Sequence, residues 1–240
     1  MNPVVKPVAF FKLADANTGS LELTKANGEY LRVAALGLPL NMTGARTVGC
    51  WFKASTLPTL TNVLHSIDHD TNASIRNWIF WLTFESGEYR FKALVRQEGS
   101  QSLYYWTWAG ADTNAHHVYW QWDPSQPSAT EHEVWIDFVS QGNGTAILSP
   151  NLTASDQPNT DFKVGWNQGV NHWDGFIDDL RIYDSLVTIS IESGNAELAD
   201  ASGTVGYYKF NGDPTDESPG ADDLTEVDGT GDVTYGAPLF

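Results

Sequence analysis

The chain has 240 residues, of which 30 are acidic and only 13 basic, and its formal net charge at pH 7 is −17. Binding to phosphates needs clustered basic side chains, so this charge argues against nucleic acid as a partner and against attachment to anionic membranes. The length suffices for one large domain with a substantial core. The single cysteine, Cys50, excludes an intramolecular disulfide, and its apolar surroundings predict a buried side chain.

Strand signals dominate the chain, whereas helix signals are scarce. In chain order, aromatic or β-branched runs cover residues 47–54, 77–84, 88–95, 101–108, 117–123, 132–139 and 176–183. The turns ESG and QEGS separate the second, third and fourth runs, which predicts an antiparallel meander. Alternation in the next two runs predicts core side chains. These are Val118, Trp120, Trp122, Val134, Ile136 and Phe138.

Two adjacent carboxylates, Asp178 and Asp179, interrupt the run FIDDLRIY, which otherwise has the pattern of a buried strand. An unpaired buried charge is very unfavourable, so each carboxylate needs a partner. Arg181 can serve Asp179 from two residues away. Asp178 needs backbone donors, a hydroxyl or a cation.

Several blocks of sequence occur together in one known family. They are NGEYLRVA, the segment 38–55 with TVGCWFKAS, HHVYWQWD at residues 116–123, and WDGFIDDLRIYD at residues 173–184. In order and spacing they resemble the laminin G-like domains of the concanavalin A-like superfamily over residues 27–184, although Ala115 stands where the family usually has Trp. The resemblance implies an all-β fold, a two-sheet antiparallel jelly-roll β-sandwich.

The segment 204–224, beginning TVGYYKF, is similar to the first strand of such domains but stands near the end of this chain. Two explanations are open. The segment folds back to complete the sandwich, as in a circular permutant, or it is the stub of a second, truncated domain. We expect the first, with one domain over residues 1–240 and a strand at residues 205–210.

Aromatic side chains next to amide groups are typical of sugar-binding sites, because sugar rings stack on aromatic faces. The loop NQGVNHWDG between two tryptophans has this character, and one aromatic face of the run 101–108 is a second candidate. The predicted ligand-binding residues are Trp166, Asn167, Asn171, His172, Trp173, Tyr104 and Trp106.

Calcium is an expected cofactor because of the acidic loops. The sequence at residues 68–72 opens like a calcium loop, but Ala73 and Ile79 replace the glycine and glutamate that an EF-hand requires. The resemblance implies that calcium sites in this family lie in loops at the rim of the sandwich. The predicted metal ligands are Asp68, Asp70, Asp174 and Asp178.

The same superfamily includes glycanases that use paired carboxylates on one strand. Glu131, Glu133 and Asp137 share a face of their run, but the glycanase spacing E-x-D-x-x-E is absent. No Ser-His-Asp order or zinc spacing is present either. We therefore expect no enzyme activity and assign no catalytic residue.

The leading hypothesis is a non-catalytic recognition module that binds surface glycans. A purely structural decoration or tail protein of a virion is the alternative, and a glycanase is a distant third. The N-terminus lacks a secretory signal, so we expect display on a virion surface, or otherwise a cytoplasmic or non-classically exported protein. Expected partners are a surface glycan or other assembly proteins, including further copies in a homo-oligomer, without nucleic acid or membrane insertion.

Overall fold

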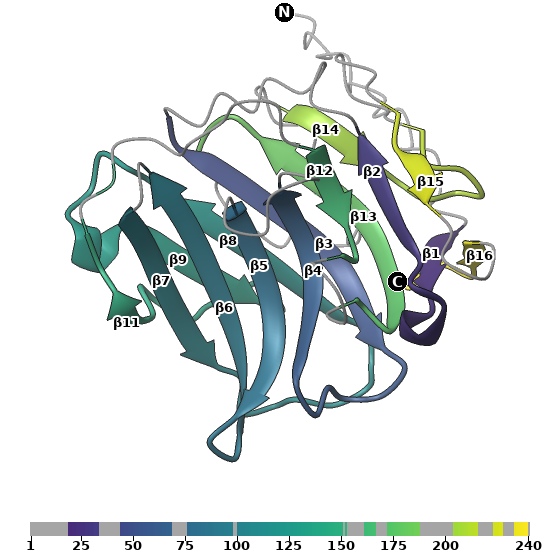
Figure 1. The fold of residues 1–240 in the computed structure, drawn as a ribbon, viewed down its shortest axis with the longest axis horizontal. Coiled ribbons are helices and arrows are strands. Elements are labelled where there is room, and N and C mark those ends of the chain that lie inside the picture. Colours follow the sequence, from purple (N-terminus) through teal and green to yellow (C-terminus); the bar gives the residue numbers. More distant parts are fainter. Residues whose placement is uncertain are drawn as a thin grey trace, which may run out of the picture.

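Two antiparallel sheets face each other in a computed structural model of the chain (Figure 1). The structure describes residues 19–33, 44–68, 76–97, 100–150, 152, 161–166, 172–187, 204–215, 223–227 and 233–239. Within these ranges, no helix has the length and apolar character needed to cross a membrane.

The first sheet has the strand order β10-β9-β8-β3-β13-β1-β16, and β14 pairs with β13 beside this path. The second sheet has the order β11-β7-β6-β5-β4-β12-β2-β15. The strands of the first sheet are β1 (Ser20–Leu23), β3 (Arg46–Ala54), β8 (His116–Trp122), β9 (His132–Ile136), β10 (Val139–Ser140), β13 (Gly175–Tyr183), β14 (Thr204–Tyr208) and β16 (Thr234–Gly236). Those of the second are β2 (Tyr30–Val33), β4 (Thr61–Asp68), β5 (Arg76–Glu85), β6 (Glu88–Gln97), β7 (Ser100–Thr107), β11 (Thr145–Leu148), β12 (Asp161–Val164) and β15 (Thr225–Val227). Two short 3₁₀ turns, Lys25–Asn27 and Ser128–Thr130, complete the elements.

The expected all-β sandwich is confirmed. The meander predicted over residues 77–108 is formed by β5, β6 and β7, which pair in sequence order. Aromatic side chains from both sheets fill the interior. Trp78 of the second sheet and Trp120 of the first lie with ring centroids 4.6 Å apart, and Phe80 stacks on Trp120 at 5.6 Å. Cys50 is buried in the same core, as its sequence context predicts.

Five of the six predicted core residues on β8 and β9 are buried in the main cluster, but the prediction for Phe138 is wrong. The strand ends at Ile136, and the two residues that follow form a tight turn to Val139. Asp137 and Phe138 have φ angles of 48° and 64°, as a type I′ hairpin turn requires. The turn places Phe138 on the outer face of the first sheet, stacked on His117 at 4.5 Å.

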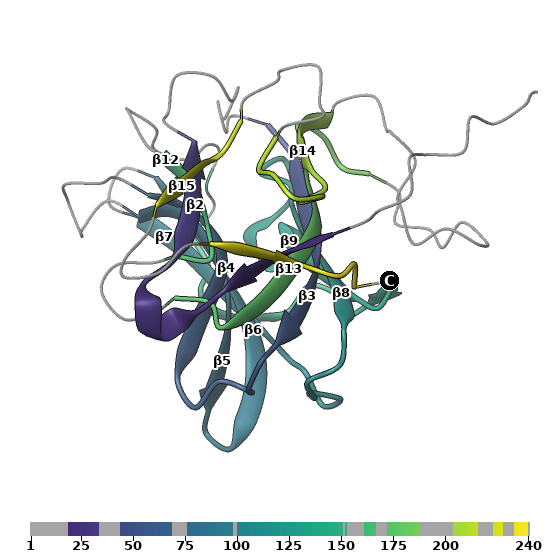
Figure 2. The ribbon, with the colours of Figure 1, turned by 90° about the vertical axis from the view of Figure 1, so that its right-hand side faces the viewer.

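The C-terminal part of the chain folds back into both sheets. β14 pairs with β13, β15 pairs with β2, and β16 pairs with β1. Figure 2 shows these late strands beside early ones. Tyr208 and Phe210 are buried in the main core, and β14 completes the sandwich as expected. The strand covers residues 204–208 rather than the predicted 205–210. The assignment of a single domain to residues 1–240 stays a prediction.

Both carboxylates of the β13 strand have partners inside the protein. Asp178 accepts hydrogen bonds from the backbone N–H groups of Asp179 at 2.7 Å and Leu239 at 3.0 Å. Asp179, with a φ of 45°, forms an ion pair with Arg181 at 2.8 Å, within a bulge in the pairing of β13 with β3. The predicted partner of Asp179 is therefore correct, and backbone donors serve Asp178.

Candidate functional site

The loop predicted as the main ligand site has one partly exposed aromatic cluster. Trp166 stacks on Tyr30 with centroids 5.3 Å apart, and His172 lies 6.4 Å from Trp166. The ammonium of Lys163 lies 3.9 Å from the centre of the Trp166 ring. The ring is thus already in contact with three side chains. Asn167 and Asn171 lie outside the described residues.

Three predicted ligand aromatics belong to the core instead, which corrects the prediction. Trp173 is fully buried, and its indole N–H donates to the Phe176 carbonyl at 3.3 Å. Tyr104 and Trp106 are 1% and 3% exposed because this face of β7 packs against the first sheet. A fully packed ring cannot stack on a sugar. The neighbouring side chain, Tyr105, lies on the opposite face of β7 and is half-buried.

A cavity of about 390 Å³ lies where β7 meets β11 and the loop that leads into β11, and we call it the edge cavity. β11 is the outermost strand of the second sheet, so the cavity is at the edge of the sandwich. Its volume falls within the range of small-molecule sites, roughly 300 to 1,000 Å³. It is lined by Tyr105, Trp106, Thr107, Gln141, Asn143, Gly144 and Thr145.

Two glycines give the loop Gln141–Gly142–Asn143–Gly144 its shape. Gly142 and Gly144 have φ angles of 72° and 71°, a region that L-residues with a side chain adopt at a free-energy cost. Gly144 lies directly against the Trp106 ring, where an added Cβ would be 2.5 Å from Cε2. The Trp106 indole donates a 2.8 Å hydrogen bond to the Gly142 carbonyl. The buried ring of Trp106 therefore fixes the loop that carries Asn143.

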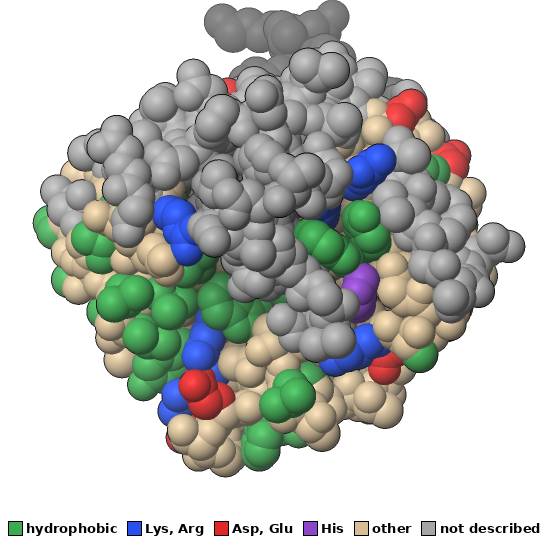
Figure 3. Space-filling model, in the orientation of Figure 1, with side chains coloured by type: hydrophobic (Ala, Val, Ile, Leu, Met, Phe, Trp, Pro, Cys, Tyr) green, Lys and Arg blue, Asp and Glu red, His purple; other side chains and the backbone are tan. Residues whose placement is uncertain are grey.

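Paired charges lie next to the edge cavity, outside its lining. The Arg90 guanidinium lies 4.3 Å from the centre of the Tyr105 ring. Arg90 donates two hydrogen bonds to Glu88, at 2.9 and 3.2 Å, and the Thr107 hydroxyl donates to the same carboxylate at 3.3 Å. Hydrogen bonding with Arg90 lowers the pKa of the Glu88 carboxyl. On the face of the molecule that Figure 1 also shows, Figure 3 has hydrophobic side chains on the left and a small group of basic and acidic side chains below them.

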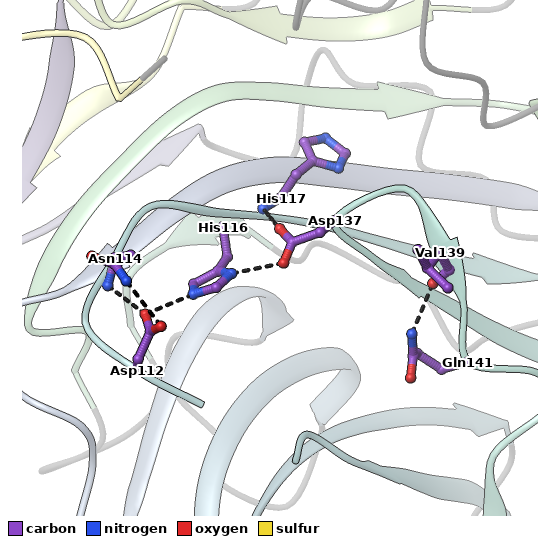
Figure 4. A network of polar contacts seen from close by, with 7 residues as sticks. All are labelled: Asp112, Asn114, His116, His117, Asp137, Val139 and Gln141. Carbon is purple, nitrogen blue, oxygen red and sulfur yellow. Dashed lines mark hydrogen bonds and ion pairs between the residues drawn. The ribbon is translucent and has the colours of Figure 1, made fainter. Parts of the chain in front are cut away.

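The side chains of the cavity offer donors and acceptors without a net charge. Gln141 donates its amide N–H to the Val139 carbonyl at 2.9 Å, which leaves its Oε1 directed away from the hairpin (Figure 4). Within the described part of the chain, no side-chain hydrogen bond occupies Asn143 or Thr145, both of which are exposed. Amides and hydroxyls both donate and accept, as sugar hydroxyls do.

A buried Ser-His-Glu contact lies between the sheets, but its hydrogen bonding does not fit a nucleophile. The Trp120 indole donates to His132 Nδ1 at 3.1 Å, so neutral His132 carries its proton on Nε2. This N–H donates a hydrogen bond to the Ser102 Oγ, which lies 2.8 Å from Nε2, and the Ser102 hydroxyl in turn donates to Glu131. His132 therefore donates to the serine and cannot accept its proton. Burial also lowers the pKa of His132.

The carboxylates considered for glycan hydrolysis are held in three separate interactions. Glu131 is buried against Ser102, and Glu133 accepts from the Ser140 hydroxyl. Asp137 accepts from the His117 backbone at 3.0 Å and lies 2.8 Å from the His116 ring, which also meets Asp112 at 2.9 Å (Figure 4). Burial opposes protonation of His116, but the bonds to both carboxylates outweigh it and raise its pKa.

The predicted metal ligands are not gathered into a site in the described part of the chain. No group of three or more His, Cys, Asp or Glu side chains there is arranged to hold a metal ion. Asp174 accepts a 3.3 Å bond from the Lys25 backbone at the start of β13. The prediction for Asp178 is corrected, because this side chain is fully buried and its oxygens accept backbone hydrogen bonds. The side chain of Asp68 and the whole of Asp70 lie outside the described residues.

A second cavity, of about 210 Å³, lies beside the segment that connects β8 to β9. Its lining includes Asp123, Gln126 and Glu133. The Asp123 carboxylate already accepts from Ser125 and from the Gln126 amide, at 2.7 and 3.1 Å. This cavity is smaller than the edge cavity and its lining contains no aromatic ring, so it is the weaker candidate for a sugar ring.

Two-sheet antiparallel sandwiches occur in several classes of all-β proteins, of which the concanavalin A-like proteins are one. Residues 25–190 match the sequence profile of the concanavalin A-like lectin/glucanases superfamily, and the chain belongs to this family. A comparison with curated proteins found no match.

Solved structures with a similar fold include proteins from two bacteria and a bacteriophage. One is a protein of Bacteroides ovatus provisionally described as carbohydrate-binding, with 14% identity, a TM-score of 0.64, and coverage of 92% of this chain but only 60% of that one. Another is the CBM40 module of the Ruminococcus gnavus IT-sialidase bound to α2,3-sialyllactose, with 11% identity and a TM-score of 0.51. The match covers 70% of this chain and 91% of that one. A third is the enzymatically active domain of tailspike protein 2 of bacteriophage CBA120, with 12% identity and a TM-score of 0.57. The match covers 80% of this chain and 30% of that one. At these identities the likeness shows the fold.

Proposed function

We propose that this protein is a non-catalytic recognition module and that it binds a glycan in the edge cavity. The single observation that carries the proposal is the lining of that cavity. A half-exposed aromatic ring, Tyr105, lies beside the amides of Gln141 and Asn143 and the hydroxyls of two threonines. Sugar-binding neighbours with the same fold and membership of the lectin/glucanase family support the proposal.

The physical reason for this choice is a match of polar groups. A sugar hydroxyl donates one hydrogen bond and accepts others, so it needs partners of both kinds at one place. The Asn143 amide supplies a donor and an acceptor, and the ring of Tyr105 supplies an apolar surface. Each hydrogen bond of this kind contributes about 0.5 to 1.5 kcal/mol net, whereas millimolar binding needs about 4 kcal/mol, so contact with the Tyr105 ring must add to two or three such bonds.

The non-catalytic part of the proposal rests on the carboxylates. Retaining hydrolysis needs two carboxyl groups about 5 to 5.5 Å apart at one bound sugar. Glu131, Glu133 and Asp137 are each engaged with a different partner, and none lines the edge cavity. A glycanase remains the alternative that the family also contains.

The proposal is tested on a glycan array, with hits measured by calorimetry. Asn143→Ala should weaken binding of a hit about fivefold or more, because an amide that makes two hydrogen bonds is lost. Gln126→Ala is the matched control, since it removes an amide from the second cavity. If Gln126→Ala reduces binding while Asn143→Ala leaves it unchanged, the site is misplaced. If no glycan binds the full chain, the function itself is refuted.

We further propose that the protein is displayed on a virion and that calcium supports a rim loop. The tailspike neighbour supports the virion setting only through its fold. The alternative is a purely structural decoration or tail protein, assembled with other virion proteins or with further copies of itself. Co-purification with particles in the absence of any glycan binding would favour that alternative.

A further inference from the structure

We propose that the edge cavity selects uncharged glycans and that the ion pair between Glu88 and Arg90 sets this selectivity. The inference rests on the proposed function of the same cavity and adds the class of ligand. It starts from three features of the described residues: the cavity lining, the partners of Arg90, and the position of Glu88.

The lining of the edge cavity contains no acidic or basic side chain. Its polar groups are amides, hydroxyls and one phenol, in a chain whose formal net charge is −17. A ligand carboxylate or sulfate in the cavity would lose water and gain no opposite charge from these side chains. Burying an ionised group without such a partner is unfavourable.

Lys92, which pairs across the strands with Tyr105, forms an ion pair with Glu85. Arg90, which pairs with Thr107, is also engaged. Its Nε and one terminal nitrogen donate to Glu88, and the other terminal nitrogen lies 3.6 Å from Glu85. Its guanidinium lies over one face of the Tyr105 ring, 4.3 Å from the ring centre. Because a carboxylate is paired with the fork that would bind an acidic sugar, Arg90 contributes little net attraction for an anion.

Glu88 lies next to the cavity lining, because it contacts Thr107. The Thr107 hydroxyl donates to Glu88, and Thr107 pairs across the strands with Arg90. An acidic sugar that reached Thr107 would therefore approach the Glu88 carboxylate. The pair acts as a filter because Glu88 occupies the donors with which Arg90 would otherwise bind an anion.

The test compares matched sugars, lactose and N-acetyllactosamine against their sialylated forms, together with other neutral and uronic acid-containing pairs on the same array. For the natural sequence we expect hits among neutral glycans, with an affinity that is nearly independent of salt. Glu88→Gln should raise the affinity for the acidic member of a pair relative to the neutral one by a few-fold, because Arg90 then lacks its nearest carboxylate. This gain should fade in high salt.

The control is Asp213→Asn, which removes one negative charge from the exposed loop after β14, away from β7 and β11 (Figure 1). It changes the net charge as much as Glu88→Gln but should not change the preference. A preference of the natural protein for acidic glycans, or an equal response of both variants, would overturn the inference and leave glycan binding standing. Absence of binding to every glycan would refute the proposed function as well.

Discussion

The loop beside the edge cavity offers a matched pair of substitutions, Gly142→Ala and Gly144→Ala. Both glycines have nearly the same left-handed φ, 72° and 71°, so alanine at either position should cost about 1 to 2 kcal/mol for the backbone alone. The two positions differ in their surroundings. Nothing lies within 4 Å of a Cβ added at Gly142, whereas a Cβ at Gly144 would be 2.5 Å from Trp106 Cε2 and 2.7 Å from Cζ2.

The collision makes the second substitution more severe. Overpacking against a buried ring costs about 1 to 3 kcal/mol, so Gly144→Ala should lower the free energy of unfolding by about 2 to 5 kcal/mol in total. Because the loop must move away from Trp106, glycan affinity should fall in this variant and stay near normal in Gly142→Ala. Urea denaturation and calorimetric titration measure the two effects. Equal destabilisation and equal affinity in both variants would refute the reasoning.

Four further predictions follow from the core, the histidines, the C-terminal strands and the acidic loops. Ile136→Ala should lower the free energy of unfolding by about 2 to 5 kcal/mol in urea, because a buried side chain is truncated; a change below 1 kcal/mol would contradict its core position. Burial lowers the pKa values of His117 and His132, so the stability that they contribute is present above their unfolded pKa, about 6.5, and is lost as the pH falls below it. His116 has a raised pKa, so the stability that it contributes is full below pH 6.5 and is lost as the pH rises through its folded pKa. His116→Gln should therefore make the free energy of unfolding fall more steeply as the pH is lowered, and an unchanged pH profile would count against this. A truncation after residue 202 removes β14, β15 and β16 together with buried Tyr208 and Phe210. The shortened protein should therefore not unfold cooperatively in a thermal melt. A stable fragment that unfolds cooperatively would show that the segment is an appendage. Millimolar calcium should raise the melting temperature, and identical curves with calcium and with chelator would refute a tight site.

The sequence predicts the sheets well because their patterns are local. Alternation identifies β5 to β9, and the two-residue turn Ser86–Gly87 between β5 and β6 lies where ESG predicts it. Phe138 is misplaced because alternation continues through the sequence while the backbone turns at Asp137. The return of the β14 segment to the sandwich is predicted from the family resemblance. Its pairing with β13, and the addition of β15 to one sheet and β16 to the other, are not.

The candidate site is harder to predict, because it joins segments that are distant in sequence. Alternation on β7 separates Tyr104 and Trp106 from Tyr105 but does not say which face is buried. The inner face is harder to recognise because it includes polar Ser102, whose partners Glu131 and His132 come from another strand region. The contact between Trp106 and Gly142 spans 36 residues. In the sequence, only the Asn143-Gly144 turn signal could have indicated this cavity.

The most direct test of the account is a crystal structure of the full chain with the neutral glycan that binds it best. We predict that a sugar ring lies in the edge cavity against Tyr105, within hydrogen-bond distance of Asn143 and Gln141, and that Arg90 stays paired with Glu88. A sugar bound instead at the Tyr30–Trp166 cluster, or in the second cavity beside Asp123, would contradict the central claim.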